Sequence, residues 1–250
     1  MTKLISPFPN VSVYADKTGK VIARHKPGPN PKIKTHPQYE NTRRNMATFG
    51  NSAKASKLIR YLFHEPLRSI NDYYASAFLT GRMYSMFRGS IPGRPTSPFQ
   101  IGHERPSLNG FNFNSRAGIY DCYFGRWSLS VENDNKRFHI CIPPVIPTQS
   151  IRNPNGGGSH YRIVPYVATI DFDTTEYNLV KTEPSDPTPR DNNSSKEISL
   201  CVDVDRPGNW LVLVALGIEF FCGPDNQLCL VAGGTHNALT ITNTFNVCVN

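Results

Sequence analysis

The sequence lacks a long apolar run. Its longest one, WLVLVALGIEFF from Trp210 to Phe221, contains Glu219 and falls far short of the roughly 20 apolar residues that a membrane-spanning helix needs. The opening residues, MTKLISPFPNVSVYADKTGK, contain neither the apolar segment nor the small-residue cleavage site of a signal peptide. We therefore expect no membrane span and synthesis in the cytoplasm. Release by a non-standard route is left open, and the final location is not assigned.

The sequence also lacks a recognisable catalytic or metal-binding motif. None of its seven histidines has a His, Cys or carboxylate partner at the spacing that a metalloenzyme helix uses, and no Cys-x-x-Cys pair occurs. The glycine-rich stretch NPNGGGSH is not followed by the Gly-Lys-Ser/Thr of a phosphate-binding loop. No Gly-x-Ser-x-Gly elbow surrounds a nucleophile. We expect no enzyme, no cofactor and no small-molecule substrate.

Two short runs carry carboxylates at alternate positions. Residues at alternate positions of a strand point to the same face, so these side chains could share a calcium ion. A strand with one solvent-facing side gives the same pattern and is the simpler explanation, so we expect no metal site. The carboxylates are Asp171, Asp173 and Glu176 in the first run, and Asp203 and Asp205 in the second.

The six cysteines are all found after residue 120, and most of them occupy apolar or alternating stretches, as small buried side chains do. Cys222 and Cys229 differ, because they flank the turn in EFFCGPDNQLCL and would lie opposite each other in a hairpin. They form the candidate disulfide of the sequence. A cytosolic protein ordinarily keeps such a pair reduced.

Negative charge is scarce in the first part of the chain. Residues 1–109 contain 17 Lys and Arg against 5 Asp and Glu, a net charge of +12, whereas residues 110–250 contain 10 against 14, a net charge of −4. A basic front of this kind either neutralises nucleic acid or another acidic surface, or it complements the acidic part of a neighbouring copy.

Residues 1–36 do not have the pattern of a stable domain. Two short runs of strand-forming residues, 11–15 and 21–24, are joined by DKTGK and followed by a basic stretch that prolines interrupt. A two-stranded hairpin on its own is marginally stable in water. We therefore predict an extended basic arm that a neighbouring subunit holds in place.

Residues 37–90 have the period of helices. In MATFGNSAKASKLIRYLF, residues 46–63, apolar and small residues recur at helical spacing, with lysines on the opposite side. Two interpretations remain open: an amphipathic helix with a solvated basic face, and a helix clamped between two bodies. A second helix is predicted over 67–87. The predicted inner faces are Met46, Phe49, Ala53, Ser56, Ile59 and Phe63 in the first helix, and Leu67, Ile70, Tyr74, Ala77, Phe78 and Tyr84 in the second.

Residues 110–250 have the pattern of strands and follow a proline-rich loop. Nine stretches of strand-forming residues alternate with clusters of turn residues, and no helical pattern lies between them. This is typical of an antiparallel sandwich rather than a parallel sheet with crossover helices. The predicted fold is mainly β with an α-helical N-terminal part: an antiparallel, jelly-roll-like β-sandwich preceded by a β-hairpin arm and two helices. The four predicted segments are 1–36, 37–90, 91–109 and 110–250.

Three stretches of the chain resemble a family of Bacteroidota proteins of about this length. They are a basic element after an early strand pair, here Arg24, Lys26 and Gly28; a helix with Phe-Gly and spaced Lys and Arg residues; and an ending with LGIEFF and NAL, here 216–221 and 237–239. The similarity spans most of the chain, although the six cysteines and the proline-rich loop depart from the family pattern. The family has no established activity, so the resemblance implies no functional residue.

The opposite net charges of residues 1–109 and 110–250 favour a function in assembly. We predict a non-enzymatic structural protein that self-assembles head to tail, as a filament, tube or shell subunit. The basic arm of one subunit would dock on the acidic sandwich of the next, and it could add a strand to the edge of that sheet. The predicted contact residues are Arg24, Lys26, Lys32, Lys34, Arg43, Lys54 and Lys57.

Two other functions are left open. A nucleic-acid-binding protein would use the aromatic and basic residues that alternate in the helical front, although no known binding signature is present. A β-sandwich that binds a carbohydrate or another ligand would carry a pocket at its loop end. The three functions predict different observations: a large particle, an affinity that falls with salt, or a ligand-dependent melting shift.

Overall fold

The chain divides into two units, Met1–Ala47 and Thr48–Asn250. We call them the arm unit and the body, and each is described by itself. Their boundary lies inside the long helix α2 (Glu40–Leu62), later than the end of the predicted arm at residue 36. The computed structural model describes residues 3–4, 11–15, 19–25, 31–88, 108–133, 136–154, 156–172, 174–182, 186–224 and 227–249.

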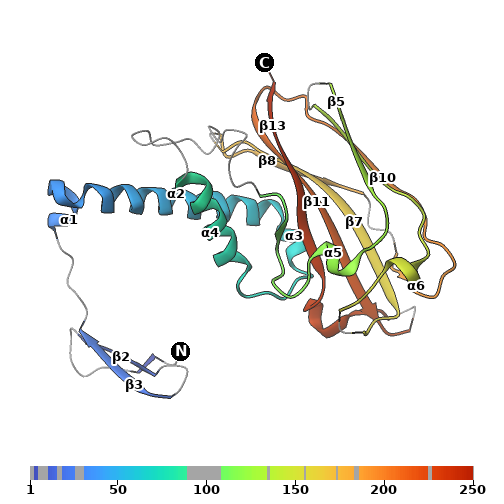
Figure 1. Ribbon diagram of the computed structural model, residues 1–250, viewed down its shortest axis with the longest axis horizontal. Helices are drawn as coiled ribbons and strands as arrows, with labels where there is room; N and C mark the ends of the chain where they lie inside the picture. Colours follow the sequence, from blue (N-terminus) through green and yellow to red (C-terminus); the bar gives the residue numbers. More distant parts are fainter. Residues whose placement is uncertain are drawn as a thin grey trace. The chain divides into compact units, whose positions relative to one another are not determined.

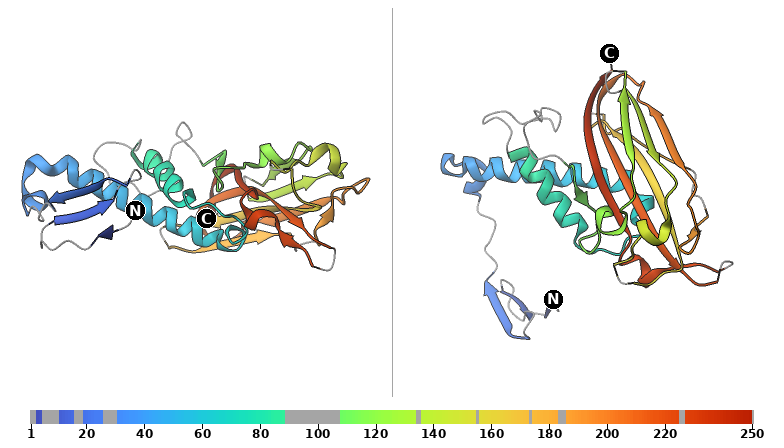
Figure 2. Two further views of the ribbon diagram at one scale, coloured as in Figure 1. Left: turned by 90° about the horizontal axis from the view of Figure 1, so that it is seen from below. Right: turned by 45° about the vertical axis from the view of Figure 1, so that its right-hand side comes forward.

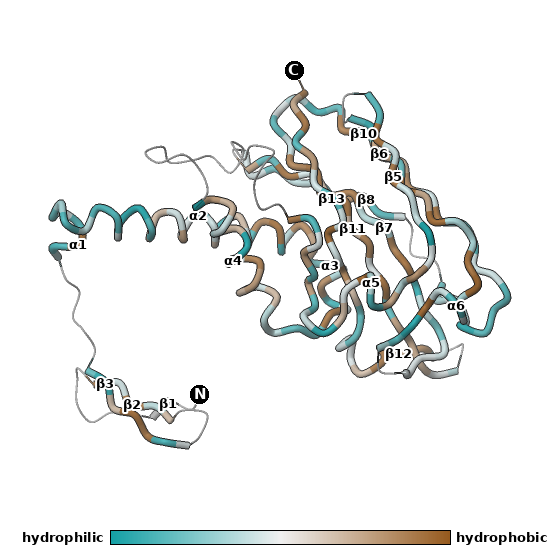
Figure 3. Tube along the Cα trace, in the orientation of Figure 1, coloured by the Kyte–Doolittle hydropathy of each residue, from teal (hydrophilic) through white to brown (hydrophobic). Residues whose placement is uncertain are grey.

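The arm unit begins with a small antiparallel sheet. β2 (Val11–Ala15) pairs along its whole length with β3 (Val21–His25), which confirms the predicted hairpin, and β1 (Lys3–Leu4) pairs with β2. The valine, isoleucine and tyrosine residues of β2 and β3 favour an extended backbone. The one-turn helix α1 (Lys32–Thr35), the 3₁₀ turn η1 (Pro37–Tyr39) and the first turns of α2 follow, and Figure 3 shows α1 and these turns of α2 as mainly hydrophilic.

Two antiparallel sheets form the body. The larger contains β4 (Phe111–Asn112), β7 (His160–Ile170), β8 (Tyr177–Lys181), β9 (Thr188–Pro189), β11 (Gly208–Cys222), β12 (Cys229–Leu230) and β13 (Ala238–Val249). The smaller contains β5 (Ser128–Glu132), β6 (Arg137–Ile142) and β10 (Ile198–Asp203). The larger sheet has the order β4-β13-β11-β7-β8, with β12 beside β11 and β9 beside β7, and the smaller has the order β10-β6-β5. Figure 1 shows the two sheets side by side as layers.

Helices cover the outer face of the larger sheet. The second half of α2, the short helix α3 (His64–Leu67) and α4 (Ala75–Arg88) lie on one side of this sheet, and the smaller sheet lies on the other (Figure 2). Three further short helical segments connect strands of the body. They are α5 (Ile119–Cys122), α6 (Pro147–Ser150) and the 3₁₀ segment η2 (Val231–Gly234).

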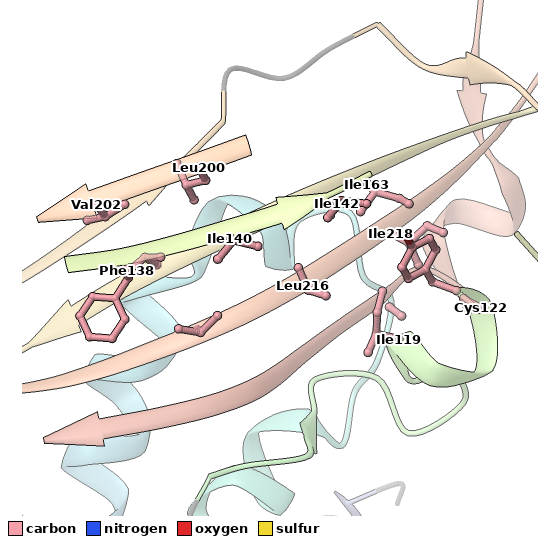
Figure 4. Close-up of a cluster of buried hydrophobic side chains, with 14 of the residues drawn as sticks. Ile119, Cys122, Phe138, Ile140, Ile142, Ile163, Leu200, Val202, Leu216 and Ile218 are labelled. Carbon is pink, nitrogen blue, oxygen red and sulfur yellow. The ribbon is translucent and has the colours of Figure 1, made fainter. Parts of the chain in front are cut away.

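The first hydrophobic core fills the space between the two sheets. Alternate residues of a strand point to one face, so Phe138 and Ile140 of β6 meet Leu216 and Ile218 of β11 there, and all four are fully buried. Figure 4 shows these side chains together with Leu200 of β10. Each large apolar side chain buried in this way contributes about 1.5–3 kcal/mol to folding.

The second core joins the helices to the larger sheet. Ile59 of α2, Phe63 directly after α2 and Leu79 of α4 are fully buried against the other face of β11 and β13, where Leu213 and Ile241 point toward them. The helices of residues 48–88 are therefore an integral layer of the body rather than a separate basic front.

The observed fold confirms the predicted class. The protein is mainly β, with antiparallel sheets in a sandwich that follows an N-terminal hairpin and helices. Each of the nine predicted strand stretches contains a strand, but the stretch 119–132 begins with the helical turn α5, and the two-residue strand β9 was not predicted. In the described part of the chain, no helix combines the length and the apolar character needed to cross a membrane.

The predicted inner face of the first helix is wrong in its first half. Met46 and Phe49 are 62% and 56% exposed, and the buried side begins at Ser52 and includes Ala55 and Ser56. These small residues bring α4 close, because the Thr80 hydroxyl of α4 donates a hydrogen bond of 3.0 Å to the Ser56 hydroxyl. The small residues of α2 therefore pack against α4 of the same chain.

The second helix begins later than predicted. Asp72 accepts hydrogen bonds from the backbone N–H groups of Tyr74 and Ser115, which holds residues 71–74 in a turn. The helix starts at Ala75 and buries Leu79, Met83, Met86 and Phe87. Tyr74 and Phe78 were predicted to lie on the inner face of this helix. Both side chains are instead exposed.

Candidate assembly surfaces

The arm unit has no hydrophobic core in its described part. None of its described residues is buried, and Val21 is 61% exposed. The register of β2 and β3 places most of their apolar side chains on one face of the small sheet, because directly paired residues of antiparallel strands share a face, while Tyr14 and Ile22 lie on the other face. The members of the first face, which we call the arm face, are Val11, Val13, Ala15, Val21, Ala23 and His25.

The arm unit also carries most of the net charge. It contains nine Lys and Arg against two Asp and Glu, a net charge of +7 in a chain of +8. Arg24 on β3 and Lys32 and Lys34 on α1 are exposed, as expected for contact residues. Lys26 lies outside the described residues.

Arg43 has a structural role within the arm unit. Its guanidinium group donates hydrogen bonds of 3.0 Å to the backbone carbonyls of Ile33 and His36. Carbonyls near the end of a helix lack intrahelical partners, so Arg43 fixes α1 against α2. It is therefore the weakest of the predicted partner contacts.

Lys54 and Lys57 belong to the body, not to the arm unit. Both are exposed on α2, and the Nζ atom of Lys57 lies 5.3 Å from the centre of the Tyr61 ring. The seven predicted contact residues are thus divided between two units.

The strand β10 forms one edge of the smaller sheet. It pairs with β6 along its whole length, and no other strand of the described chain pairs with its outer side. Leu200 and Val202 point into the core, while Ser199, Cys201 and Asp203 face solvent. An edge of this kind presents unpaired backbone groups that another strand can use.

Charged residues flank this edge strand at both ends. The acids Glu197 and Asp205 lie just before and just after β10 and are exposed, and each has an exposed basic neighbour in sequence, Lys196 and Arg206. Asp203 is an exception, because it forms an ion pair of 2.7 Å with Arg137 on β6, and the hydrogen bond from Arg137 lowers the pKa of this carboxyl. Asp186 and Asp191, in the segment that leads to β10, are also exposed.

Cys222 and Cys229 lie opposite each other, as the hairpin prediction requires. They are direct partners in the antiparallel pairing of β11 with β12, both are exposed, and both are free thiols in the structure. The disulfide itself stays a prediction. Cys122, in contrast, is buried, and burial raises the pKa of its thiol to about 12.

The carboxylate runs have other structural explanations. Asp171 is buried, and its side chain accepts a hydrogen bond from the backbone N–H of Thr174. Asp173 lies outside the described residues, and Asp203 is paired with Arg137. Within the residues that the structure describes, no group of three His, Cys, Asp or Glu side chains is arranged to hold a metal ion.

A hollow of about 320 Å³ lies between α3 and the outer face of the larger sheet. Four of its five charged side chains are paired, and the fifth is Arg68: Arg162 contacts Glu219 at 2.6 Å, and Lys181 hydrogen-bonds to Glu65, which lowers the pKa of that carboxyl. Because both carboxylates have a cationic partner on the same chain, these groups hold α3 and the strands together rather than offering charge to a ligand.

A second hollow, of about 480 Å³, adjoins the edge strand β10. It is lined by apolar side chains such as Ile142 and Tyr161 and by polar ones such as Ser195, Lys196 and Glu197. This mixture does not select one class of ligand. Neither this hollow nor the β10 edge was foreseen, because strand order cannot be read from the spacing of strands along the chain.

No family model, no curated protein and no solved structure matches this chain. The resemblance to a Bacteroidota family therefore stays a prediction.

Proposed function

We propose that the protein is a non-enzymatic structural subunit that assembles head to tail, with the arm unit of one copy docked on the body of the next. One observation carries this proposal: none of the described residues of the arm unit is buried. Ordering a residue costs about 1–2 kcal/mol of backbone entropy, which a small sheet with an uncovered apolar face cannot offset. A partner that covers the arm face would supply the missing burial.

The edge strand β10 is the acceptor that fits this arm best. Adding a strand from another copy would satisfy its outer backbone groups, and the acidic residues Glu197 and Asp205 complement Arg24 of β3. Donor and acceptor are different surfaces of one chain, so the contact repeats from copy to copy. Such contacts produce closed rings or open fibres. The proposed filament, tube and shell forms would be built from them.

The first test is the size of the particle as a function of concentration. Light scattering and negative-stain microscopy of the full-length protein should show large particles. Deletion of residues 1–35 should give folded monomers whose melting temperature equals that of the full-length chain diluted below its assembly concentration. A full-length protein that stays monomeric at high concentration would refute the proposal, and a deletion that lowers the melting temperature of a monomer would show that the arm packs on its own chain.

A matched pair of variants tests the arm face. Val13 lies on the arm face, whereas Ser12 is the neighbouring residue of β2 on the opposite face. Val13→Lys should abolish large particles, because it places a charge in the proposed contact, and Ser12→Lys adds the same charge but should preserve them. Equal loss in both variants would mean that the arm face is not the specific contact, because Ser12 lies on the opposite face beside Arg24.

A further inference from the structure

A basic hollow of about 370 Å³ lies where α2 ends and α3 begins, and it belongs to the body. Four of its six lining residues are Lys, Arg or His, and none is acidic. The lining residues are Lys57, Arg60, Tyr61, His64, Leu67 and Arg68.

Arg60 provides the second observation. Its Nε atom is buried and has no hydrogen-bond partner among the described residues. A buried donor without an acceptor costs about 1–3 kcal/mol, so native proteins nearly always provide one, often a water molecule or an ion. Because this Nε atom is shielded from solvent, an anion in the hollow that Arg60 lines would supply the acceptor only once the Arg60 side chain shifts toward it.

Lys57 and His64 are held at the hollow by contacts with Tyr61, and no carboxylate lines the hollow to neutralise them. The ammonium group of Lys57 is placed over the Tyr61 ring, and Nδ1 of His64 lies 3.1 Å from the Tyr61 carbonyl oxygen, which leaves Nε2 as its second polar atom. Glu65 is adjacent in sequence, but its carboxylate is hydrogen-bonded to Lys181 of β8.

A purely structural explanation covers only part of this arrangement. Cations near the C-terminal end of a helix interact favourably with the helix dipole, and α2 ends at Leu62. That effect favours basic residues at this end of α2. It does not require a hollow, and it does not explain the buried Nε of Arg60.

We propose that this hollow binds the oxyanion of a phosphate group. Arginine presents several N–H donors in a planar fork that matches phosphate oxygens, and hydrogen bonds between charged groups are about twice as strong as neutral ones. Arg60 and Arg68 would donate to the oxygens, with Lys57 adding charge. The ligand class includes inorganic phosphate and phosphate esters, and the site is independent of the proposed assembly.

The test is a titration of the full-length protein with inorganic phosphate at constant ionic strength, followed by calorimetry and by melting temperature. Saturable binding with one phosphate per chain is expected. Lys57→Ala and Arg60→Ala should each weaken it roughly ten-fold. Lys54→Ala is the matched control, because Lys54 is an exposed lysine of the same helix that does not line the hollow, and its effect should be less than about two-fold.

Arg60→Lys keeps the positive charge if Arg60→Ala fails to fold, and it should still weaken binding because the planar fork of guanidinium donors is lost. Competition by a short single-stranded oligonucleotide separates the sources of the phosphate: displacement of phosphate that depends on Lys57 and not on Lys54 assigns the site to a nucleic-acid backbone, and absence of displacement assigns it to a small phosphate compound. The proposal is overturned if binding does not saturate, or if Lys54→Ala weakens it as much as Lys57→Ala.

Discussion

At the scale of a single residue, Gly234 lies where the turn after α3 meets the larger sheet. Its φ angle is +83°, and a Cβ atom at this position would overlap the carbonyl oxygen of Ser69. The same oxygen accepts a 2.7 Å hydrogen bond from the buried Asn237 amide, whose oxygen accepts from the backbone N–H of Phe220. The turn after α3 is therefore held against the strands by contacts that require glycine.

Gly234→Ala should lower the free energy of unfolding by about 3 kcal/mol, since it combines a left-handed backbone with an overlap that must push Ser69 away. Urea unfolding measures the change. Gly156→Ala is the control, because Gly156 also has a positive φ angle of +73° but has open space around it. Its cost should be only about 1 kcal/mol. Equal costs would show that the Ser69 contact is unimportant.

Asp72 should make stability depend on pH. Partial burial raises the pKa of its carboxyl, but the hydrogen bonds from Ser115 and Tyr74 outweigh this and hold the pKa below its ordinary value. A carboxyl whose pKa is lower in the folded state stabilises the fold above its unfolded pKa, about 3.9, and this contribution disappears as the pH falls through the folded value.

Asp72→Asn should therefore cost about 1–2 kcal/mol at pH 7, and the difference from the wild type should shrink as the pH is lowered below about 4. Unfolding by urea at a series of pH values measures it. Glu176→Gln, which changes an exposed carboxylate, should have almost no effect at any of these pH values. A cost for Asp72→Asn that is the same at every pH would refute the electrostatic explanation.

At the scale of elements, the strands were predictable and the helix faces were not. Strands such as β11 were predicted correctly because short runs of Val, Leu and Ile between turn clusters are typical of buried strands. The buried side of α2 was misjudged because Met46 and Phe49 are larger and more apolar than Ser52 and Ser56, and tertiary contact with α4 selected the small residues instead. Periodicity alone cannot supply that contact.

The hairpin of β11 and β12 allows a test of the predicted disulfide. In oxidised glutathione, exchange should join Cys222 to Cys229, with two thiols oxidised and one glutathione disulfide reduced to two thiols. Mass spectrometry should show the loss of two hydrogen atoms, and closing so short a loop should add at most about 2 kcal/mol.

Cys222→Ser should prevent the mass change. Cys201→Ser should preserve it, because Cys201 is also exposed but lies opposite His139 in the strand pairing. A wild-type protein that instead carries glutathione on both cysteines, without an internal link, would show that the two strands do not hold the sulfur atoms within bonding distance.

At the scale of the whole molecule, the boundary of charge and the boundary between the two units do not coincide. The net charge is still +5 over residues 48–109 and becomes negative only after them, whereas the arm unit ends at Ala47 and carries a net charge of +7. The helices of residues 48–88 could not be assigned to the body from composition, because their burial depends on contacts with β11 and β13, which lie more than 100 residues later.

Charge reversal beside β10 tests whether the β10 edge is the acceptor surface for the arm unit. If the arm unit docks on the β10 edge, reversing the charge of Glu197 and Asp205 to Lys should raise the concentration needed for assembly about ten-fold, and less so at high salt, where surface charges are screened. Adding Arg24→Glu to this variant should partly restore assembly, because opposite charges face each other again. Sedimentation velocity over a range of concentrations measures both effects.

Glu132→Lys is the control that separates a local contact from general repulsion. Glu132 is an exposed acid of the same sheet, but it lies on β5 at the opposite edge from β10. Because long-range repulsion depends on net charge and a docking contact depends on position, only the changes beside β10 should disturb assembly strongly. If Glu132→Lys were as disruptive per charge as the Glu197 and Asp205 changes, the arm would be attracted by the overall negative charge of residues 110–250, and β10 would not be its specific acceptor.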